Sequence, residues 1–306
     1  MSEIIKNEPC GVIVVNKHKG VTSHDIVNKI RRLYGTKRVG HTGTLDPLAT
    51  GVLVVLVGRA AKASEYLVCD SKKYRATLRL GLTSDSEDIT GNILTESDDI
   101  PSFDEVKKTC EKFVGSIKQI PPMYSALKVD GKKLVDLARA GQTVERQARD
   151  ITVFSIEITP TDVKTDYILD VHCSSGTYIR TLCADIGASL DCGGLMAELE
   201  RREAGGFDLE KSYTVDEIEA MSEEERIALL VPTEQLFESL REVRLESFYE
   251  KLSRNGCEIY QKKAKTDFAI GERVRMLTKD GCFYALGEVR EYEAGTAIKA
   301  IKLFDL

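Results

Sequence analysis

An unbroken apolar run, GVLVVLV at residues 51–57, constrains the fold more than any other stretch of this chain. A strand with one face in water alternates apolar and polar side chains, whereas a strand covered on both faces is apolar throughout. We therefore predict a strand at 51–57 with protein layers on both of its sides. A second run, GVIVVN at residues 11–16, predicts another buried strand.

Helices and half-buried strands surround these runs. Thr22 and Asp25 have the spacing of a capping box, and an apolar stripe of helical period follows as far as Gly35. The same reasoning predicts a strand over 74–80, a helix over 102–114, a strand over 166–173 and a helix that follows Gly176 within 174–190. Alternating strands among helices favour the α+β class with a mixed sheet.

Two segments depart from this pattern. Residues 121–142 are basic and rich in helix breakers, which predicts a long, loop-like excursion from the domain. The acidic helical segment 214–230 ends at Pro232, and three short alternating strands separated by glycine turns follow in the C-terminal part. We therefore predict a main domain over 1–232 and a small β-barrel over 246–306. So short a unit is marginally stable alone, so we expect it to pack on the main domain.

The net charge of −6 conceals an asymmetry along the chain. Residues 1–80 hold 14 Lys and Arg against 6 Asp and Glu, a net charge of +8, so residues 81–306 carry −14. A basic lobe on an acidic protein fits a polyanionic partner that docks on one face. Solvated lysines without any partner fit the same numbers, and charge alone does not separate the two interpretations.

Composition and motifs exclude several classes of function. The N-terminus has no apolar segment long enough for a signal peptide, and no run approaches the ~18 apolar residues of a membrane span, so we expect a cytoplasmic protein. The 8 Cys are scattered without a C-x-x-C pair, which indicates reduced, mostly buried thiols. Neither Cys nor His cluster at ligand spacings, so no metal is expected. The signatures of nucleotide-binding loops, serine hydrolases and zinc hydrolases are absent, so no nucleotide cofactor is expected.

One acid, Asp46, stands in the turn-rich stretch GHTGTLDPLATGVL (40–53). Asp before Pro47 is a good helix cap or turn initiator, and this local interpretation needs no function. A functional interpretation is also open, because Asp before Pro is held out of the helical region. The glycines at 40, 43 and 51 would let the backbone approach a ligand closely. A carboxylate held on such a loop suits a nucleophile or a general base.

Three other side chains are candidates for a site. Arg180 falls at the start of a predicted helix, where the macrodipole disfavours a cation. This suggests a specific anion nearby, such as Asp46, although an arginine extended along the helix surface is the alternative. Tyr74 lies on the apolar face of its strand as a core tyrosine would, and its ring would also suit stacking on a base. His41 and His24 fit turn or capping roles better than catalytic ones.

The stretch 40–53 resembles the aspartate motif of bacterial tRNA pseudouridine-55 synthases, the TruB family. Further blocks of that family are similar to segments of this chain, in the same order and at fitting spacing: GVIVVNKHKGVTSHDIV, KKYRATLRLGLTSDSEDITG, IPPMYSALKVDGKKLVDLARAG, CSSGTYIRTL and LERREAGGF. Together the blocks span about residues 10–215. The C-terminal unit resembles, more weakly, the PUA-type RNA-binding module that many members carry.

The resemblance implies a pseudouridine synthase fold, with a mixed, largely antiparallel central sheet and an RNA-binding cleft. It implies isomerisation of uridine to pseudouridine at position 55, in the T-arm of tRNA, by a monomer without cofactor or metal. In this family's pattern Asp46 is the catalytic aspartate, Tyr74 the active-site tyrosine and Arg180 the arginine partner. The substrate-binding positions that the resemblance implies are His41, which helps to hold the everted nucleotide, Tyr178, Leu199 and Lys17. The segment 121–150 matches the insertion that clamps the T-loop.

The chain departs from the family pattern at two places. His18 follows Lys17 where the family usually has Pro, which makes that turn less rigid, and Glu200 follows Leu199 where the family usually has Arg. The acid puts one phosphate contact or ion pair in doubt. Two other functions are weighed against the enzyme: an RNA-binding tRNA-folding chaperone without required catalysis, and the catalytic subunit of a guide-RNA particle. The presence of Asp46 and its partners favours the enzyme, and the bacterial-type blocks argue against the guide particle.

Overall fold

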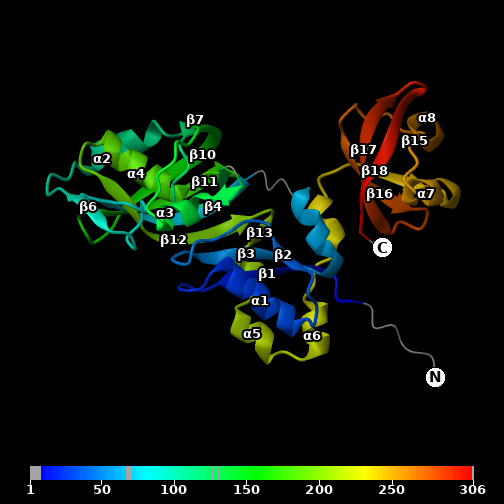
Figure 1. Ribbon diagram of the computed structural model, residues 1–306, viewed down its shortest axis with the longest axis horizontal. Coiled ribbons are helices and arrows are strands. Elements are labelled where there is room, and N and C mark those ends of the chain that lie inside the picture. The colour runs from blue at the N-terminus through cyan, green and yellow to red at the C-terminus, as the bar shows by residue number, and fades with distance from the viewer. Residues whose placement is uncertain (1–7, 67–70, 126, 130, 305–306) are drawn as a thin grey trace.

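Two β-sheets, one of nine strands and one of five, organise the chain. The computed structural model describes residues 8–66, 71–125, 127–129 and 131–304. The molecule is elongated, with the nine-stranded sheet and its helices at one end and in the middle, and the five-stranded sheet at the other end (Figure 1).

The larger sheet has the order β1-β3-β12-β4-β11-β10-β7, with β2 paired to β3 and β13 paired to β12. Its strands are β1 (Gly11–Lys17), β2 (Val39–His41), β3 (Thr50–Val57), β4 (Ser71–Leu80), β7 (Gly115–Gln119), β10 (Arg149–Pro160), β11 (Asp166–Ser174), β12 (Gly194–Ala204) and β13 (Phe207–Asp208). β12 runs parallel to β3, and the other pairs are antiparallel. The predicted mixed, largely antiparallel sheet is therefore confirmed.

The apolar run at 51–57 forms most of β3 and is buried throughout. The odd-numbered residues of 53–57 face the main core, where helix α1 (Ser23–Leu33) packs. The even-numbered residues of 52–56 face a second core, which includes Phe304, the residue after the last strand of the C-terminal sheet. Both faces of β3 are therefore covered, as the sequence predicts.

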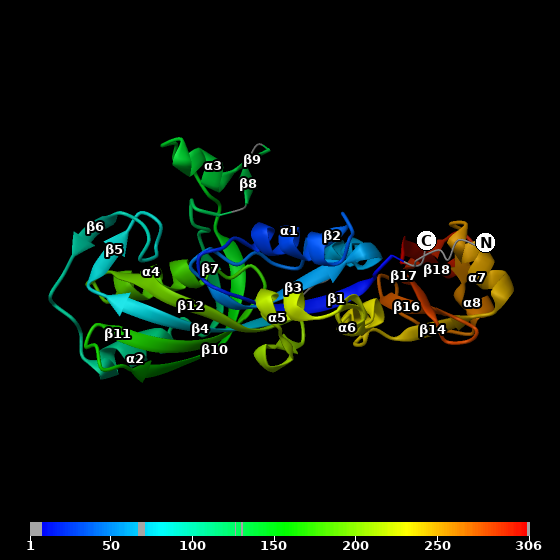
Figure 2. The ribbon, with the colours of Figure 1, turned by 90° about the horizontal axis from the view of Figure 1, so that it is seen from below.

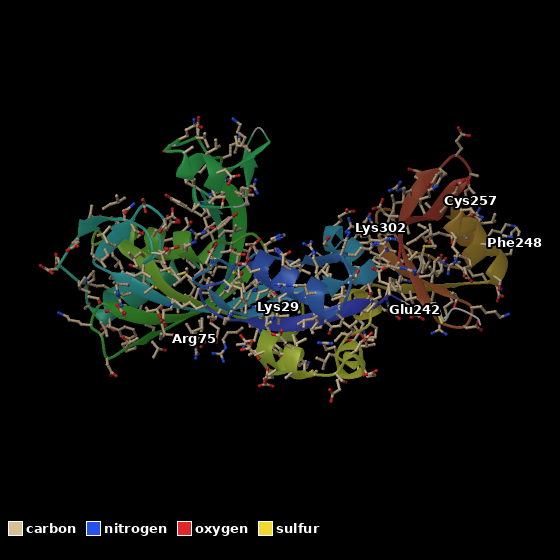
Figure 3. All side chains as sticks on the ribbon, turned by 60° about the horizontal axis from the view of Figure 1, so that its bottom comes forward. Lys29, Arg75, Glu242, Phe248, Cys257 and Lys302 are labelled. Carbon is tan, nitrogen blue, oxygen red and sulfur yellow. The ribbon has the colours of Figure 1, made fainter. Side chains whose placement is uncertain are left out.

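The predicted alternation along β4 is also confirmed. Tyr74 is buried on the face that belongs to the main core. On the opposite face Arg75 pairs with Asp170 of the neighbouring strand, with 2.7 Å between Nη2 and Oδ2. Figure 3 shows Arg75 on the side of the sheet that faces away from the projecting segment around residues 128–139.

Helices cover one side of the larger sheet and the edge strand β1. They are α1, α2 (Phe103–Glu111), α4 (Ile179–Ser189), α5 (Val215–Ala220) and α6 (Glu223–Ala228), with short 3-10 turns at Gly58–Glu65, Leu209–Lys211 and Thr233–Phe237. The capping box predicted at Thr22 and Asp25 is present, and so is one at Ser102 and Glu105. None of the helices in the described ranges combines the length and the apolar composition that crossing a bilayer requires.

The acidic segment 214–230 forms two short helices rather than one, because Ser222 starts a second capping box. It lies along the edge of the larger sheet. Its flanks hydrogen-bond to β1, through Tyr213 at 2.8 and 3.0 Å and through Val231 at 2.8 Å. Glu219 accepts a hydrogen bond from Lys29 of α1 at 2.7 Å. This pair joins a basic residue of the region 1–80 to an acidic residue of the region 81–306 within the fold.

The excursion after β7 carries secondary structure of its own, so the prediction of a loop was wrong in this respect. It contains β8 (Lys128–Val129), β9 (Lys132–Lys133) and α3 (Leu134–Arg139). Leu134 is 1% exposed and Leu137 9%, which gives the segment enough apolar contact to hold a short helix. Figure 2 shows it projecting from the body of the molecule beside β7.

The smaller sheet has the order β14-β16-β17-β18-β15 and is curled. Its elements are β14 (Glu242–Leu245), α7 (Ser247–Arg254), β15 (Ile259–Tyr260), α8 (Gln261–Ala264), β16 (Arg273–Thr278), β17 (Phe283–Tyr292) and β18 (Gly295–Leu303). The three predicted alternating strands are present as β16, β17 and β18. The first strand, β14, begins four residues before position 246.

The smaller sheet packs on the second face of β3, as expected. Phe237 contacts Phe283 and Phe304, with ring centroids 6.0 and 5.7 Å away. At the rim, Lys302 pairs with Glu65, with 2.9 Å between Nζ and Oε2. The contact buries apolar surface that β3 would otherwise expose to water, which is the main force that joins the two parts.

Candidate active site

Asp46 lies in a tight turn between β2 and β3. The N–H of Ala49 donates a hydrogen bond to the Asp46 carbonyl at 3.0 Å, with Pro47 at the second position of the turn. The Pro47 carbonyl in turn accepts a hydrogen bond from the N–H of Gly20 at 2.8 Å. The interpretation as a turn initiator is therefore confirmed. The helix-cap interpretation is wrong, because the chain runs from this turn directly into β3.

Close packing of β3 on β12 holds one end of this loop. Gly51 has φ +99°, and a Cβ at this position would lie 2.3 Å from the carbonyl oxygen of Arg201. The expectation that Gly51 admits a ligand was therefore wrong, because its lack of a side chain admits the neighbouring strand. Arg201, 1% exposed, donates from Nε to the Val52 carbonyl at 2.7 Å and from Nη2 to the Gly43 carbonyl at 3.0 Å.

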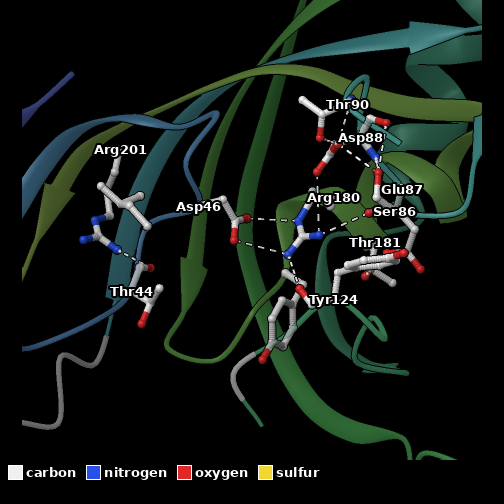
Figure 4. A network of polar contacts seen from close by, with 12 residues as sticks. Thr44, Asp46, Ser86, Glu87, Asp88, Thr90, Tyr124, Arg180, Thr181 and Arg201 are labelled. Atoms are coloured by element: carbon white, nitrogen blue, oxygen red, sulfur yellow. Dashed lines mark hydrogen bonds and ion pairs between the residues drawn. The ribbon is translucent and has the colours of Figure 1, made fainter. Parts of the chain in front are cut away.

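Arg180 is the partner of Asp46. Its Nε lies 3.0 Å from Asp46 Oδ2, and its Nη2 donates to Oδ1 at 3.4 Å (Figure 4). Arg180 is only 4% exposed, which excludes the alternative of an arginine on the helix surface. The anion that its position at the start of α4 suggested is therefore present.

The remaining N–H groups of Arg180 are also used. Nη1 donates to the Ser86 carbonyl at 3.1 Å and lies 3.7 Å from Asp88 Oδ2, while Nη2 donates to the Tyr124 carbonyl at 2.9 Å. Asp88 belongs to the loop between β5 (Leu82–Ser84) and β6 (Ile93–Glu96), and Tyr124 belongs to the excursion. The guanidinium thus joins three segments and has little freedom to leave Asp46.

A cavity of about 450 Å³ lies beside this pair. Among the residues that line it are Asp46, Tyr74, Tyr178, Arg180 and Leu199. The structure therefore brings together five of the seven residues that the resemblance implies. They come from β4, β12, the start of α4 and the turn before β3, so the site exists only in the folded chain.

His41 and Lys17 lie outside the lining of that cavity, as far as the described residues show. His41 ends β2, and its buried Nδ1 has no hydrogen-bond partner among them. Burial lowers the pKa of His41, which favours the neutral ring. The Lys17 side chain is fully buried, so the structure does not place it where a substrate would touch it.

Lys17 instead holds the turn of Asp46 through hydrogen bonds to backbone carbonyls. Its Nζ donates to the carbonyls of His18 at 3.0 Å, Val21 at 2.9 Å and Pro47 at 3.4 Å. Burial lowers the pKa of this amine to about 8, and the nearby charge of Asp46 partly opposes the shift. A cation with three carbonyl partners is suited to fixing a loop.

Two opposing influences set the charge of Asp46. Burial raises its pKa and so does the neighbouring Asp88, while Arg180 and Lys17 lower it; the net direction is upward. Burial thus favours the protonated form of Asp46, and Arg180 favours the ionised form. A carboxyl group acts as a nucleophile only when it is ionised. Tyr74 stays a neutral phenol, since burial raises its pKa.

Several residues of the site carry no signal in the sequence. Asp88 is one of several acids in its block, and Tyr124 takes part through a backbone carbonyl, which no side-chain pattern can reveal. Nothing in the sequence assigned a role to Arg201. Glu200, the departure from the family pattern, pairs with Arg202 at the surface, with 3.3 Å between Oε2 and Nη1. In the described part of the chain, no group of three or more His, Cys, Asp or Glu is placed to hold a metal ion.

Comparisons with known proteins identify the family of this chain. Residues 31–179 match the family described as TruB family pseudouridylate synthase (N terminal domain), and residues 180–238 match the tRNA pseudouridylate synthase B C-terminal domain. The tRNA pseudouridine synthase B of Alkaliphilus oremlandii is 45% identical over 250 residues, which are 82% of this chain and 83% of that protein. The protein of the same name from Clostridium kluyveri is 37% identical over 295 residues, 96% of this chain and 99% of that one.

A solved structure is similar over nearly the whole chain. The crystal structure of a Cbf5-Nop10-Gar1 complex contains a chain that is 26% identical, with a TM-score of 0.69, and the match covers 96% of this chain and 84% of that one. The likeness confirms the predicted pseudouridine synthase fold, including the curled C-terminal sheet. By its sequence matches and its fold, the chain belongs to the TruB family of tRNA pseudouridylate synthases and is an isomerase.

Proposed function

We propose that this enzyme converts uridine 55 in the T-arm of tRNA to pseudouridine, with Asp46 as the nucleophile. The observation that carries the proposal is the Asp46 carboxylate, held at two points by Arg180 in the wall of the 450 Å³ cavity. A cavity of that volume accommodates a small ligand such as one nucleoside. The relatives named tRNA pseudouridine synthase B support tRNA as the substrate.

The target base must first leave its stack. A base inside a stem-loop is inaccessible to a carboxylate, so it is everted into the cavity at a cost of a few kcal/mol. Tyr74 then packs on the extruded uracil, and Tyr178 and Leu199 form the neighbouring walls. We assign to His41, outside the cavity, the place that the base vacates in the stack.

The chemistry needs Asp46 ionised and aimed, and Arg180 serves both needs. The carboxylate either adds to C6 of the uracil or assists departure of the base from C1′ of the ribose. In both routes the N1–C1′ bond breaks, the base rotates, and a bond forms between C5 and C1′. The proton on C5 is then lost, N1 ends protonated, and Asp46 is regenerated as a free carboxylate. The product is an isomer of the substrate, so the atoms balance without a co-reactant.

The rest of the chain serves RNA binding in this proposal. Residues 1–232 are the catalytic domain, and the insertion at 121–150 clamps the T-loop. The position of the insertion supports this role, because Tyr124 and Val135 line the cavity. Residues 246–306 are a PUA-like RNA-binding module. We propose that the protein is a monomer and acts in the cytoplasm, the compartment that holds its tRNA substrate.

An unmodified tRNA transcript tests the proposal directly. The purified protein, incubated with the transcript and no guide RNA, is expected to form pseudouridine at position 55, mapped chemically. Asp46→Asn is expected to form none while it still binds the transcript. Product from both proteins would refute the role of Asp46, and product from neither would favour an RNA-binding chaperone.

A further inference from the structure

Gln119 makes an unusual pair of hydrogen bonds. Its side-chain Nε2 donates to the carbonyl of Tyr178 at 3.0 Å, and its Oε1 accepts from the N–H of the same residue at 2.8 Å. Gln119 is 2% exposed, so these bonds are shielded from water. One amide side chain thus fixes both backbone groups of a residue that is 59 positions away in the sequence.

Tyr178 stands at a place where the backbone needs such support. It is the N-cap residue of α4, and within the described structure its own side chain makes no capping bond. The chain enters this position from a turn at Gly176, which has φ +90°. Glycine is the residue with the widest conformational freedom, so the turn itself does little to hold Tyr178. Arg180 follows two residues later, and its direction depends on how this first turn of α4 is set.

Gln119 also borders the insertion in the sequence. Gln119 is the last residue of β7, directly before the segment that contains Tyr124. The Tyr124 carbonyl accepts a hydrogen bond from Arg180 at 2.9 Å. The start of the insertion and the start of α4 are therefore joined twice, once through the Gln119 amide and once through the guanidinium that contacts Asp46.

We propose that Gln119 is a positioning residue for the reaction: by fixing the peptide groups of Tyr178, its amide aims Arg180 at Asp46 and keeps the start of the insertion aligned with the site. The inference rests on the proposed roles of Asp46 and Arg180. An amide side chain presents a donor and an acceptor side by side in one plane, which an aliphatic side chain of similar size does not.

Two variants test the role. Gln119→Leu removes both hydrogen bonds, and Gln119→Met removes both with a side chain closer to glutamine in length. On saturating tRNA transcript, the single-turnover rate of pseudouridine formation is expected to fall about 100-fold in each, as expected for a misaligned reacting group. The tRNA dissociation constant should change much less than the rate, because the rest of the RNA-binding surface is untouched. The acidic limb of the pH profile should move to higher pH, because a displaced Arg180 no longer helps to keep Asp46 ionised.

Gln261 provides a matched control for stability. It is 6% exposed, donates to the Phe268 carbonyl at 3.0 Å and accepts from the Phe268 N–H at 2.8 Å, the same pair of backbone hydrogen bonds, here between α8 and the loop that follows it. Gln261→Leu is expected to lower the melting temperature as Gln119→Leu does. On saturating tRNA its single-turnover rate should fall far less than that of Gln119→Leu, and its acidic limb should not move.

Three results would overturn the inference. One is a wild-type rate in both Gln119 variants. Another is a loss of rate in step with tRNA affinity and without a shift of the acidic limb, which would mark a purely structural residue. If Gln119→Leu does not fold, Gln119→Met decides between these results alone. The third is a wild-type protein that forms no pseudouridine, which would refute the proposed function as well.

Discussion

Arg180 contacts both carboxylate oxygens of Asp46, with Nε 3.0 Å from Oδ2 and Nη2 3.4 Å from Oδ1. The same guanidinium reaches the Tyr124 carbonyl and the loop that carries Asp88, so one buried arginine aims the carboxylate and ties it to the surrounding segments.

Loss of Arg180 should therefore affect chemistry more than binding. Arg180→Ala is expected to lower kcat by about 100-fold or more, because it removes a preorganised charge beside the reacting group. The affinity for tRNA should change little. Arg180→Lys keeps the charge without the two-point contact, so its kcat should lie between those of the wild type and Arg180→Ala. Single-turnover kinetics and a tRNA binding assay measure both quantities. Equal losses of turnover and affinity would make Arg180 a docking residue instead.

The pH profile should report the raised pKa of Asp46. In the proposed mechanism Asp46 reacts in its ionised form, and burial raises its pKa above the usual value of an aspartate. Activity is thus fully present above that pKa and is lost as the pH falls through it, so the acidic limb should lie above the usual aspartate range. Single-turnover rates across a pH series measure the limb, with tRNA binding at each pH as the control. A limb at or below the usual range would show that Arg180 outweighs burial.

Lys17→Met should destabilise the protein, since it leaves three carbonyls without their donor, at a cost of about 2 kcal/mol or more. The effect should also depend on pH. Between about 8 and the usual 10.5, the unfolded chain still binds a proton that folded Lys17 has released. Stability due to Lys17 therefore rises with pH in this window. The gap between wild type and variant in the free energy of unfolding should widen from pH 8 upward, as denaturant titrations would measure. A constant gap would contradict the lowered pKa.

Gly51→Ala should damage both the fold and the site. The new Cβ would lie 2.3 Å from the Arg201 carbonyl, in a backbone region with φ +99°. We expect a loss of at least about 2 kcal/mol of stability, as for a strained backbone position. Gly20→Ala is the matched control, because Gly20 also has positive φ (+93°) but has open space around its Cβ position. Chemical denaturation of both variants separates strain from collision; equal losses would mean that the backbone conformation alone matters.

Phe304→Ala should loosen the C-terminal sheet from β3. Phe304 is 5% exposed in the second core, so its truncation should cost about 3 kcal/mol. Phe248→Ala is the control within the same part of the chain, since that ring is 68% exposed and points away from the molecule (Figure 3). Thermal unfolding should show a lower melting temperature only for Phe304→Ala. Similar melting temperatures for both variants would show that the contact with β3 adds little stability.

The elements themselves follow from local rules. The apolar run at 51–57 predicts a strand with two covered faces, and the capping boxes at Thr22 and Ser102 mark the starts of two helices. These patterns work because side-chain period and capping bonds involve residues close together in the chain. The excursion was harder to predict, since α3 depends on contacts of Leu134 and Leu137 with residues outside its own short helix.

The site divides in the same way. The sequence by itself determined that Asp46 and Pro47 form a chain reversal or a helix cap and that Arg180 falls at the start of a helix, because turns and capping are local. It left open whether Arg180 has an anionic partner. Only the tertiary structure decided that these two side chains meet, that Lys17 lies beneath the turn and not in the cavity, and that Gly51 makes room for a strand. Each of these depends on which distant strands become neighbours, and that is settled by the burial of apolar faces across the whole chain.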